Sequence, residues 1–416
     1  MSSVPTSPAS NTTAANSDTN SDSDSAVRST GPSAAPAATQ TPTPTPTPTQ
    51  VADQAVNLSA VNPSAVPRSH HTPLPTATES ARWQRQLATA IRSREALLQR
   101  LGLTDHPQLA ALSDDQQVKE QSAAAFGTLV PESFVRRMTP GDPQDPLLRQ
   151  VLQDPAEGAT VDGFVADPVG DAAARTADGV LHKYQGRVLL ITTGACAVHC
   201  RYCFRRNYPY HAEPRRLAEW QPALEYIASS TDISEVILSG GDPLTLTDDR
   251  LSELCRAIDS IPHVQRIRFH TRLPIVLPAR VTDELLACLR SLRAQPVMVV
   301  HANHAQEIQA DCREALRRLV MSGVVTLNQA VLLAGINDTV DAQVELSENL
   351  VNIGVMPYYL HQLDRVTGAA HFETDPAFGL QLIDAMAARL PGYAVPKLVK
   401  EVAGANSKTP VEKLPR

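Results

Sequence analysis

The sequence predicts an α/β fold with a partial (β/α)6 barrel at its centre. Strand-like and helix-like segments alternate from Arg187 to Gly392, and this alternation is typical of parallel sheets. There are six such strand–helix units, whereas a closed barrel of this kind needs eight. The residues before the barrel show helical patterns, and residues 1–80 differ in composition from the rest of the chain. We therefore predict a tail, a helical lead-in, an open barrel and a C-terminal segment.

The first 80 residues are rich in Ser, Thr, Ala and Pro, and the first aromatic residue of the chain is Trp83. Such a segment buries too little apolar surface to offset the conformational entropy lost on ordering. The run TPTPTPTPT, from Thr41 to Thr49, is expected to be extended and similar to polyproline. We expect residues 1–80 to be a disordered tail without a catalytic role.

Residues 81–182 are expected to form a helical region that packs on the barrel. Apolar side chains recur at helical spacing around Trp83, Leu87 and Ile91, and Ser80 is a suitable N-cap. The segment PESFVRRM, which begins at Pro131, is a second and shorter candidate helix.

Residues 183–380 are predicted to form the barrel, and residues 381–416 a C-terminal segment. The predicted strands are RVLLITT, EVILSGG, VQRIRFHTR, PVMVVHAN, VVTLNQAVLL and VMPYYLHQL. The helices that follow them are EWQPALEYIASS, LTDDRLSELCRAIDSI, TDELLACLRSL, CREALRRLVMSG, DAQVELSENLVNIG and PAFGLQLIDAMAARLPG. In such barrels the catalytic groups lie at the C-terminal ends of the strands.

The composition excludes several classes of protein. The formal net charge is -7, whereas nucleic-acid binding needs clustered Lys and Arg. No apolar run approaches the roughly 20 residues of a membrane span, and the N-terminus shows no secretory signal. We therefore expect a cytoplasmic protein that binds neither nucleic acid nor membrane. Its six cysteines are expected to be reduced thiols or metal ligands.

Three cysteines with the spacing Cx3Cx2C, Cys196, Cys200 and Cys203, directly follow the first predicted strand. Three thiolates in one short loop can bind a cubane [4Fe-4S] cluster and leave one iron open to a small molecule. The alternative is zinc, because a structural zinc site closes with four ligands, and His199 or His211 could supply the fourth. The other three cysteines lie in predicted helices and are expected to be small buried apolar groups.

With the aromatic Tyr202 before the third cysteine, this loop resembles the cluster loop of the radical S-adenosylmethionine (SAM) superfamily. The resemblance implies that the open iron binds SAM and that Tyr202 contacts the cofactor. Reduction by one electron then cleaves SAM to a 5'-deoxyadenosyl radical, and the protein positions this chemistry. The motif SGGDPL after the second strand resembles the SAM-binding element of the superfamily, which implies that Gly240, Gly241 and Asp242 contact SAM. An ordinary strand-to-helix turn is the alternative for this motif.

Lys408 lies near the C-terminus in the small-residue loop ANSKTPV. A lysine in such a loop can form a Schiff base with pyridoxal 5'-phosphate (PLP). A solvated surface charge is the alternative.

Several motifs, in this order along the chain, together resemble the lysine 2,3-aminomutase family from about residue 130 to the end. They are CAVHCRYCFRRNYPY, SGGDPL, RLPIVLPAR, LNQAVLL, PYYLHQLDRVTGAAHF and SKTPV. The similarity is greatest to the bacterial branch that makes (R)-β-lysine for the modification of translation elongation factor P (EF-P), and LHKY and PKLVKE add to it. The resemblance implies a TIM-like radical SAM barrel with a C-terminal segment that carries the PLP lysine.

The family resemblance also implies roles for single residues. The three cysteines ligate the cluster, and Lys408 carries PLP. Arg205 binds the substrate carboxylate, for which a planar guanidinium is suited. Asp364 and Glu401 receive the distant ammonium group of lysine. The residues implied to hold PLP are Lys183, Tyr184, Arg187, Gln329 and, through its aromatic face, His361.

Two features depart from the clostridial free-lysine enzymes of the family. Glu401 stands where those enzymes have a second ammonium-binding aspartate, so the charge is kept with a longer reach. The sequence has eight residues after Lys408, without the zinc-binding C-terminal extension, and Thr339 stands at the remaining zinc-ligand position. We therefore expect no structural zinc.

The resemblance implies an isomerase that converts (S)-α-lysine to (R)-β-lysine for the β-lysylation of EF-P. Its implied partners are EF-P and the lysyl-transferase of EF-P, and a flavodoxin or ferredoxin that donates electrons; a homo-oligomer is left open. One alternative is a catabolic 2,3-aminomutase for free lysine or another amino acid, which Glu401 and the C-terminus disfavour. The other is a non-catalytic iron–sulfur or zinc module that senses redox state, which would need neither the Lys408 loop nor the GGD turn.

Overall fold

The computed structural model describes residues 78–110, 127–214 and 216–412. The predicted tail, residues 1–80, therefore lies outside the described residues except for its last three. None of the helices in the described ranges is sufficiently long and apolar to span a membrane.

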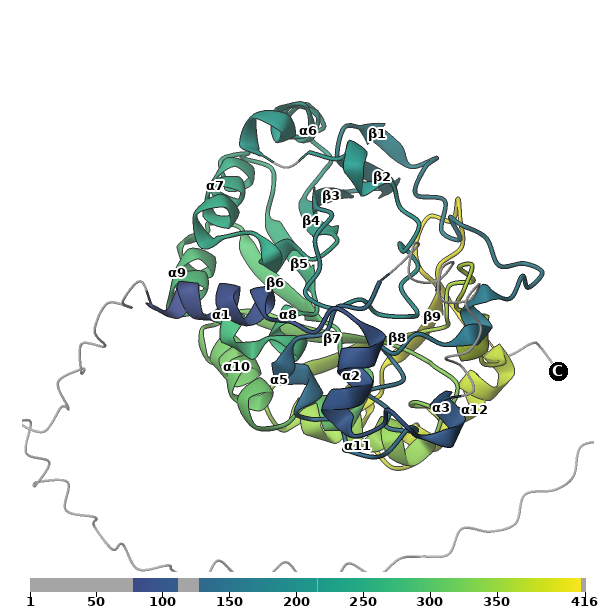
Figure 1. Cartoon of the computed structure of the whole chain (residues 1–416). Coiled ribbons are helices and arrows are strands. Elements are labelled where there is room, and N and C mark those ends of the chain that lie inside the picture. Colours follow the sequence, from purple (N-terminus) through teal and green to yellow (C-terminus); the bar gives the residue numbers. More distant parts are fainter. Residues whose placement is uncertain (1–77, 111–126, 215, 413–416) are drawn as a thin grey trace, which may run out of the picture. The chain divides into compact units, whose positions relative to one another are not determined.

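One sheet of ten strands, ordered from β1 to β10 as in the sequence, forms the centre of the fold. The six predicted strands are confirmed, and each pairs in parallel with the next. They are β3 (Arg187–Thr193), β4 (Glu235–Gly240), β5 (Arg266–Thr271), β6 (Gln295–Val300), β7 (Val325–Val331) and β8 (Met356–His361). The order does not return to β1 in the described residues, so the sheet is a curved, open barrel (Figure 1).

Four short strands extend the sheet beyond the prediction. β1 (Arg175–Ala177) and β2 (Val180–Tyr184) form an antiparallel edge on β3, so the end of the region predicted to be helical, 81–182, is extended instead. β9 (Lys397–Lys400) pairs in parallel with β8, and β10 (Thr409–Pro410) returns antiparallel to β9. Strands this short carry too few residues for their periodicity to be recognised.

The predicted helices that follow the six strands are also confirmed, and they cover the outer face of the sheet (Figure 1). They are α6 (Leu217–Ser229), α7 (Asp248–Asp259), α9 (Asp283–Ser291), α10 (Ala310–Met321), α11 (Val340–Val351) and α12 (Pro376–Ala387). Each places an apolar stripe on the sheet, as Leu251, Leu254 and Ile258 do in α7. The helices therefore cover only the outer face of the sheet, and the inner face carries side chains of the strands and of the loops that follow them.

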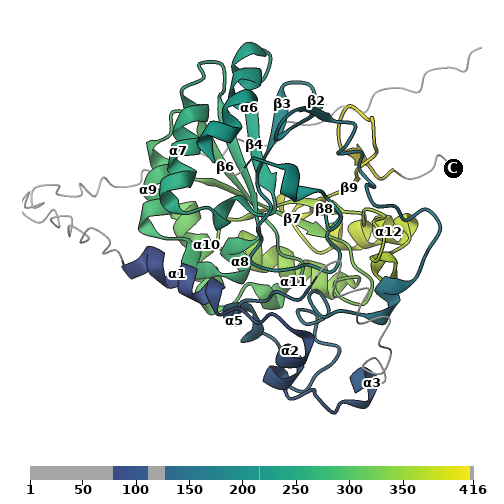
Figure 2. The ribbon, with the colours of Figure 1, turned by 45° about the horizontal axis from the view of Figure 1, so that its top comes forward.

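The N-terminal lead-in contains α1 (Thr78–Ala88), α2 (Arg94–Leu101), α3 (Pro107–Ala110) and α5 (Glu132–Val135), which lie along one side of the barrel (Figure 2). The continuous helical pattern around Trp83 is divided into α1 and α2. The Ser93 side chain caps α2 by accepting from the backbone N–H of Ala96 at 3.1 Å, because such a side chain satisfies a free helical donor.

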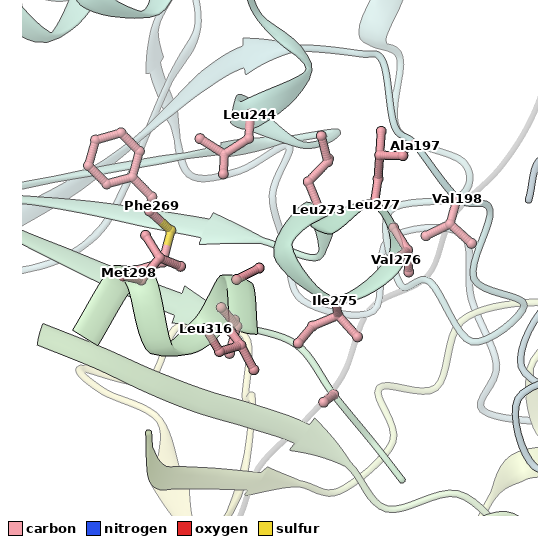
Figure 3. Packing of buried hydrophobic residues seen from close by; sticks show 14 of the residues in the cluster. Ala197, Val198, Leu244, Phe269, Leu273, Ile275, Val276, Leu277, Met298 and Leu316 are labelled. Carbon is pink, nitrogen blue, oxygen red and sulfur yellow. The ribbon is translucent and has the colours of Figure 1, made fainter. Parts of the chain in front are cut away.

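A four-residue helix after β5, α8 (Leu273–Val276), connects the lead-in to the barrel interior. All four of its residues are buried. The Ser133 hydroxyl in α5 donates to the backbone oxygen of Val276 at 2.6 Å. Figure 3 shows Val276 beside Ala197 and Val198 of the cysteine loop. The cysteine loop therefore packs directly against the apolar core through Ala197 and Val198.

Candidate active site

A cavity of about 570 Å³ opens on the inner face of the barrel, and every predicted site residue lines it. These residues are Lys183, Tyr184, Arg187, Cys196, Cys200, Tyr202, Cys203, Arg205, Gly240, Gly241, Asp242, Gln329, His361, Asp364, Glu401 and Lys408. They come from segments more than 200 residues apart, as the hydrogen bond from Tyr184 to Glu401 illustrates. The structure therefore brings the predicted residues together, while their roles as ligands stay predictions.

Strand alternation explains which side chains face the cavity. In β5, Ile267 and Phe269 are fully buried in the core, whereas Arg268 and His270 line the cavity. Successive side chains of a strand point to opposite faces of the sheet, so β5 places polar groups inward. Gln329 on β7 follows the same rule.

The three cysteines of the loop after β3 are free thiols that face the cavity together. In the part of the chain that the structure describes, no three His, Cys, Asp or Glu side chains are close enough to hold a single metal ion. A cubane cluster does not require this, because its thiolates bind different irons. Neither His199 nor His211 lines the cavity, so the zinc alternative gains no fourth ligand from them. The donor set fits a cluster with one open iron.

Burial makes two of the three thiols, Cys196 and Cys203, harder to deprotonate when no metal is bound. Burial raises the pKa of the Cys196 thiol well above its usual value, and it raises the pKa of Cys203 to about 11. Iron must therefore displace the protons when it binds.

The glycines of the GGD turn are required by the cysteine loop itself. A Cβ atom on Gly241 would collide with the backbone oxygen of Ala195. Gly240 has a φ of 110°, and a Cβ atom there would lie 2.8 Å from the backbone oxygen of Thr193. A side chain at either position would displace the loop, so close packing is a second reason for the glycines beside ligand approach.

Asp242 connects the turn to the end of β5. Its carboxylate accepts from the Thr271 hydroxyl and from the backbone N–H of Arg272, both at 2.7 Å. Burial raises the pKa of Asp242 to about 6, against the lowering effect of these hydrogen bonds. Both carboxylate oxygens of Asp242 thus already accept hydrogen bonds from the protein. A contact between Asp242 and SAM would be made in addition to these hydrogen bonds.

Gln150 of the lead-in is a site residue that the sequence pattern did not reveal. Its side-chain oxygen accepts from the guanidinium of Arg272 at 2.6 Å and from the amide of Asn303 at 2.9 Å. The same Asn303 amide donates to the Tyr202 hydroxyl at 2.7 Å. Gln150 of the lead-in therefore helps to fix, through Asn303, the side chain of Tyr202, which lies between Cys200 and Cys203 in the sequence.

Asp171 is a second residue that the pattern did not reveal, and it holds two cavity cations. One oxygen pairs with Arg205 Nε and the other with Lys183 Nζ, both at 2.7 Å. Burial alone would raise the pKa of Asp171, but the two cations lower it overall. Arg205 also donates to the Ser239 hydroxyl at 3.3 Å. The proposed carboxylate-binding arginine is thus oriented before substrate arrives.

The hairpin between β9 and β10 brings Lys408 to the wall of the cavity. Lys408 Nζ lies 2.8 Å from a carboxylate oxygen of Glu401. The other oxygen accepts a hydrogen bond from the Tyr184 hydroxyl and lies 3.8 Å from Lys183 Nζ. Glu401 was predicted to receive the substrate ammonium, and in this arrangement it already pairs with an ammonium group.

Asp364 faces the same space without a side-chain hydrogen bond to the described residues. Burial raises its pKa to about 7, against the lowering effect of Lys408. A nearby cation would favour its ionised form. Asp364 is therefore a half-buried acid that a cationic ligand can ionise.

The histidines of the cavity are neutral. Burial lowers the pKa of His301 to about 3 and the pKa values of His270 and His361 well below the usual range. His270 Nε2 is buried and has no hydrogen-bond partner in the described residues. A neutral His361 ring suits the stacking role predicted for it, and His270 offers an unused polar atom to a ligand.

The remaining cysteines lie on the outer helices. Cys255 and Cys312 are buried, and Cys288 is half-buried. All three pack in or against the main apolar core. This placement agrees with the prediction for the first two, and Cys288 is more exposed than predicted.

Comparison with known proteins gives a consistent result, although no protein-family model matches. The L-lysine 2,3-aminomutase of Escherichia coli (strain K12) is 42% identical over 79% of this chain and 94% of that protein. The L-lysine 2,3-aminomutase of Haemophilus influenzae is 41% identical over 80% of this chain and 96% of that protein. That of Clostridium subterminale is 32% identical over 79% of this chain and 77% of that protein. A radical SAM methyltransferase structure from Sphaerobacter thermophilus matches 51% of this chain and 66% of that chain at 17% identity, with a TM-score of 0.37. The chain belongs to the L-lysine 2,3-aminomutase family and is an isomerase of the radical SAM aminomutase type.

Proposed function

We propose that the protein converts (S)-α-lysine to (R)-β-lysine with a [4Fe-4S] cluster, SAM and PLP, and that the product serves the β-lysylation of EF-P. The observation that carries this proposal is the shared cavity. The cysteine loop, Lys408, a fixed arginine and two carboxylates all line it. A radical initiator, a carbonyl cofactor and an amino acid with a distant cation can thus meet in one enclosed space.

At the cluster side, we propose that Cys196, Cys200 and Cys203 bind three irons and leave the fourth to SAM. The backbone of Gly240 and Gly241 and the ring of Tyr202 line the adjoining space. The cofactor supplies a carbon radical when reduced, and the protein must keep that radical away from water. The buried core under the loop serves that purpose.

At the lysine side of the cavity, which Lys408 and Glu401 define, we propose that Lys408 holds PLP and that Lys183, Tyr184, Arg187 and Gln329 surround it. Lys183 and Arg187 are cations suited to a phosphate group, and Arg187 lies 4.5 Å from the centre of the Tyr184 ring. The PLP ring supplies a π-system that delocalises an unpaired electron beside the migrating nitrogen. Glu401, which pairs with Lys408 at 2.8 Å, loses that cation when the lysine nitrogen is used by the cofactor.

For the substrate, we propose that Arg205 binds the carboxylate while Asp364 and Glu401 receive the side-chain ammonium. Asp171 holds Arg205 Nε at 2.7 Å. The terminal nitrogens make only longer contacts, at 3.3 Å to the Ser239 hydroxyl and 3.5 Å to Asp171, and a substrate carboxylate would replace these contacts with a bidentate pair. The partial burial of Asp364 favours a cationic partner, since removing a carboxylate from water without a partner is costly. Two acids at this end favour lysine over an acidic amino acid.

The link to EF-P is supported by sequence resemblance. The motifs are most similar to the bacterial branch that acts on EF-P, and Glu401 stands in place of the aspartate of the free-lysine enzymes. We also propose an EF-P lysyl-transferase as the consumer of the product and a flavodoxin or ferredoxin as the electron donor. A catabolic aminomutase is the second candidate.

The proposal is tested with the purified protein under anaerobic conditions. Reconstitution with iron and sulfide, followed by SAM, PLP, a strong reductant and L-lysine, should yield (R)-β-lysine, detected by chiral chromatography. Absence of any isomerised amino acid would refute the aminomutase proposal. Mass spectrometry of EF-P from cells that lack this protein separates the two candidates. Loss of a lysyl-type mass addition supports the EF-P role, and an unchanged mass favours the catabolic enzyme.

A further inference from the structure

Arg272 is a buried charged residue to which none of the roles above has been given. It follows β5 directly, and only 6% of its surface is exposed. Its Nη1 atom lies 2.7 Å from the Sγ atom of Cys200 and is placed to donate a hydrogen bond to it. A guanidinium thus contacts one of the three proposed cluster ligands directly.

The other terminal nitrogen and an aromatic ring also fix the guanidinium, whereas its buried Nε has no hydrogen-bond partner in the described residues. Nη2 donates to Gln150 Oε1 at 2.6 Å and to Glu307 Oε2 at 3.0 Å. The guanidinium carbon lies 5.6 Å from the centre of the Tyr202 ring, within the range of a cation–π contact. These partners hold the guanidinium at the sulfur and prevent it from turning towards a substrate.

Glu307 makes this arrangement possible in the core. It is fully buried, and it also accepts hydrogen bonds from the backbone N–H groups of Asn303 and His304 at 2.8 and 3.1 Å. A buried arginine without such a partner would be costly. The ion pair with Glu307 therefore stabilises a buried positive charge beside the cysteine loop.

We infer that Arg272 raises the reduction potential of the cluster by donating an N–H hydrogen bond to the Cys200 thiolate. The inference rests on the proposed function, in which Cys200 is an iron ligand. Reduction adds one electron to the cluster from an external reductant, so negative charge accumulates on its iron and sulfur atoms. Hydrogen bonds to the sulfurs and nearby positive charge stabilise that state relative to the oxidised one. Arg272 is thus a positioning residue that makes the electron-accepting step easier, and it undergoes no chemical change.

The test is a redox titration of the reconstituted full chain without SAM, followed by electron paramagnetic resonance of the reduced cluster. The main variant is the double substitution Arg272→Gln with Glu307→Gln, which removes both members of the ion pair and leaves no unpaired buried charge. Arg272→Lys is the second variant, because it keeps the charge but cannot span Cys200 and Glu307 with one fork. Iron content is measured in every sample.

We expect about four irons per chain in all variants, and a reduction equilibrium at least tenfold less favourable in the double variant, which is 59 mV for one electron. Arg272→Lys should give a smaller shift in the same direction. A midpoint equal to that of the wild type in both variants would overturn the inference. So would loss of iron, because Arg272 would then hold the loop and not set the potential.

Arg280 provides the matched control. It is fully buried in the same segment, and it donates to the backbone oxygen of Leu244 at 2.7 Å. Its ion-pair partner is Asp248 at 2.8 Å, so the control is Arg280→Gln with Asp248→Asn. It should leave the midpoint unchanged; an equal shift there would mean that general loosening of the core is the cause, and would overturn the inference. If the wild-type chain itself fails to bind iron through its three cysteines, the proposed function fails before this inference is tested.

Discussion

The two sides of the cavity are built differently. On the cluster side, Tyr202, Asp242, Arg272 and Asn303 are all buried and joined by hydrogen bonds. On the lysine side, Lys408 stands in a hairpin whose residues 402–404 and 406–407 are exposed. The cluster side is therefore fixed by the core, whereas the lysine side is held by a few contacts near the surface.

The difference matches what each side has to do in the proposed reaction. A cluster that delivers a radical needs a constant, dry surrounding, and buried hydrogen-bond networks provide one. A lysine that exchanges its bonding partner during each cycle needs room to move, and segments with few buried contacts open more readily.

The largest effect is expected when the cluster side loses a ligand. Cys200→Ala should abolish activity and lower the iron content, because the remaining two thiolates do not hold a site-open cubane. Iron analysis and the absorbance of the reconstituted protein measure this. Cys312→Ala, which removes a buried thiol from α10, should retain the full iron content; equal losses in both variants would contradict the assignment.

The next largest effect should be confined to the lysine side. Lys408→Ala should remove the absorbance of covalently bound PLP and with it the activity, while the iron content is unchanged. Unchanged iron content would show that the cluster does not depend on bound PLP, although Asp171 joins Arg205 of the cysteine loop to Lys183. Lys400→Ala, at an exposed position of β9, is the matched control. Survival of the PLP absorbance in Lys408→Ala would show that another lysine carries the cofactor.

A substitution of Asp171 tests whether the ion pair that orients Arg205 contributes to lysine binding. Asp171→Asn should raise the KM for lysine about 10- to 100-fold, because hydrogen bonds to charged groups contribute about 1.5–3 kcal/mol and each 1.4 kcal/mol is tenfold. Steady-state kinetics with intact iron content measure it. Asp178→Asn changes an exposed acid that pairs with Arg175 and should have no such effect. An unchanged KM in Asp171→Asn would mean that Arg205 needs no anchor.

The smallest effect is a pH dependence on the lysine side. Burial raises the pKa of Asp364 to about 7, so the free acid is protonated below that pH and ionised above it. Lysine binds the ionised form, so its affinity should rise with pH up to about 7 and then level off, by at most tenfold per unit. Binding of lysine to the PLP-free, unreduced protein, in which Lys408 keeps its charge, measures this.

Two controls accompany the pH series. Asp364→Asn should weaken lysine binding and flatten its pH profile. An amino acid of similar length with a neutral side chain should bind without this dependence. A lysine profile that persists in Asp364→Asn would assign the titration to another group of the cavity.

Much of the fold followed from local patterns. The six parallel strands and the six helices after them repeat often enough for alternation and helical spacing to be recognised. The four short strands could not be recognised in this way. The last part of the lead-in, for which a helix was expected, forms the hairpin of β1 and β2 at the edge of the sheet. β9 and β10 exist because the sheet edge at β8 offers unpaired backbone groups, and a local pattern cannot show a distant edge.

The sequence by itself determined the chemistry that this protein can carry. Cys196, Cys200 and Cys203 lie within eight residues of one another, so their spacing keeps three thiols in one loop. The motifs around Lys408 and Asp364 were also readable, because each is a contiguous stretch.

The tertiary structure alone decided how these groups are supported. Gln150 and Arg272 are 122 residues apart, and Asp171 meets Lys183 and Arg205 from a loop without regular pattern. Such contacts depend on which strand ends adjoin in the barrel, and not on neighbours along the chain. A buried charge becomes acceptable only when the fold supplies its partner, so no single stretch of sequence could assign Arg272 to Cys200.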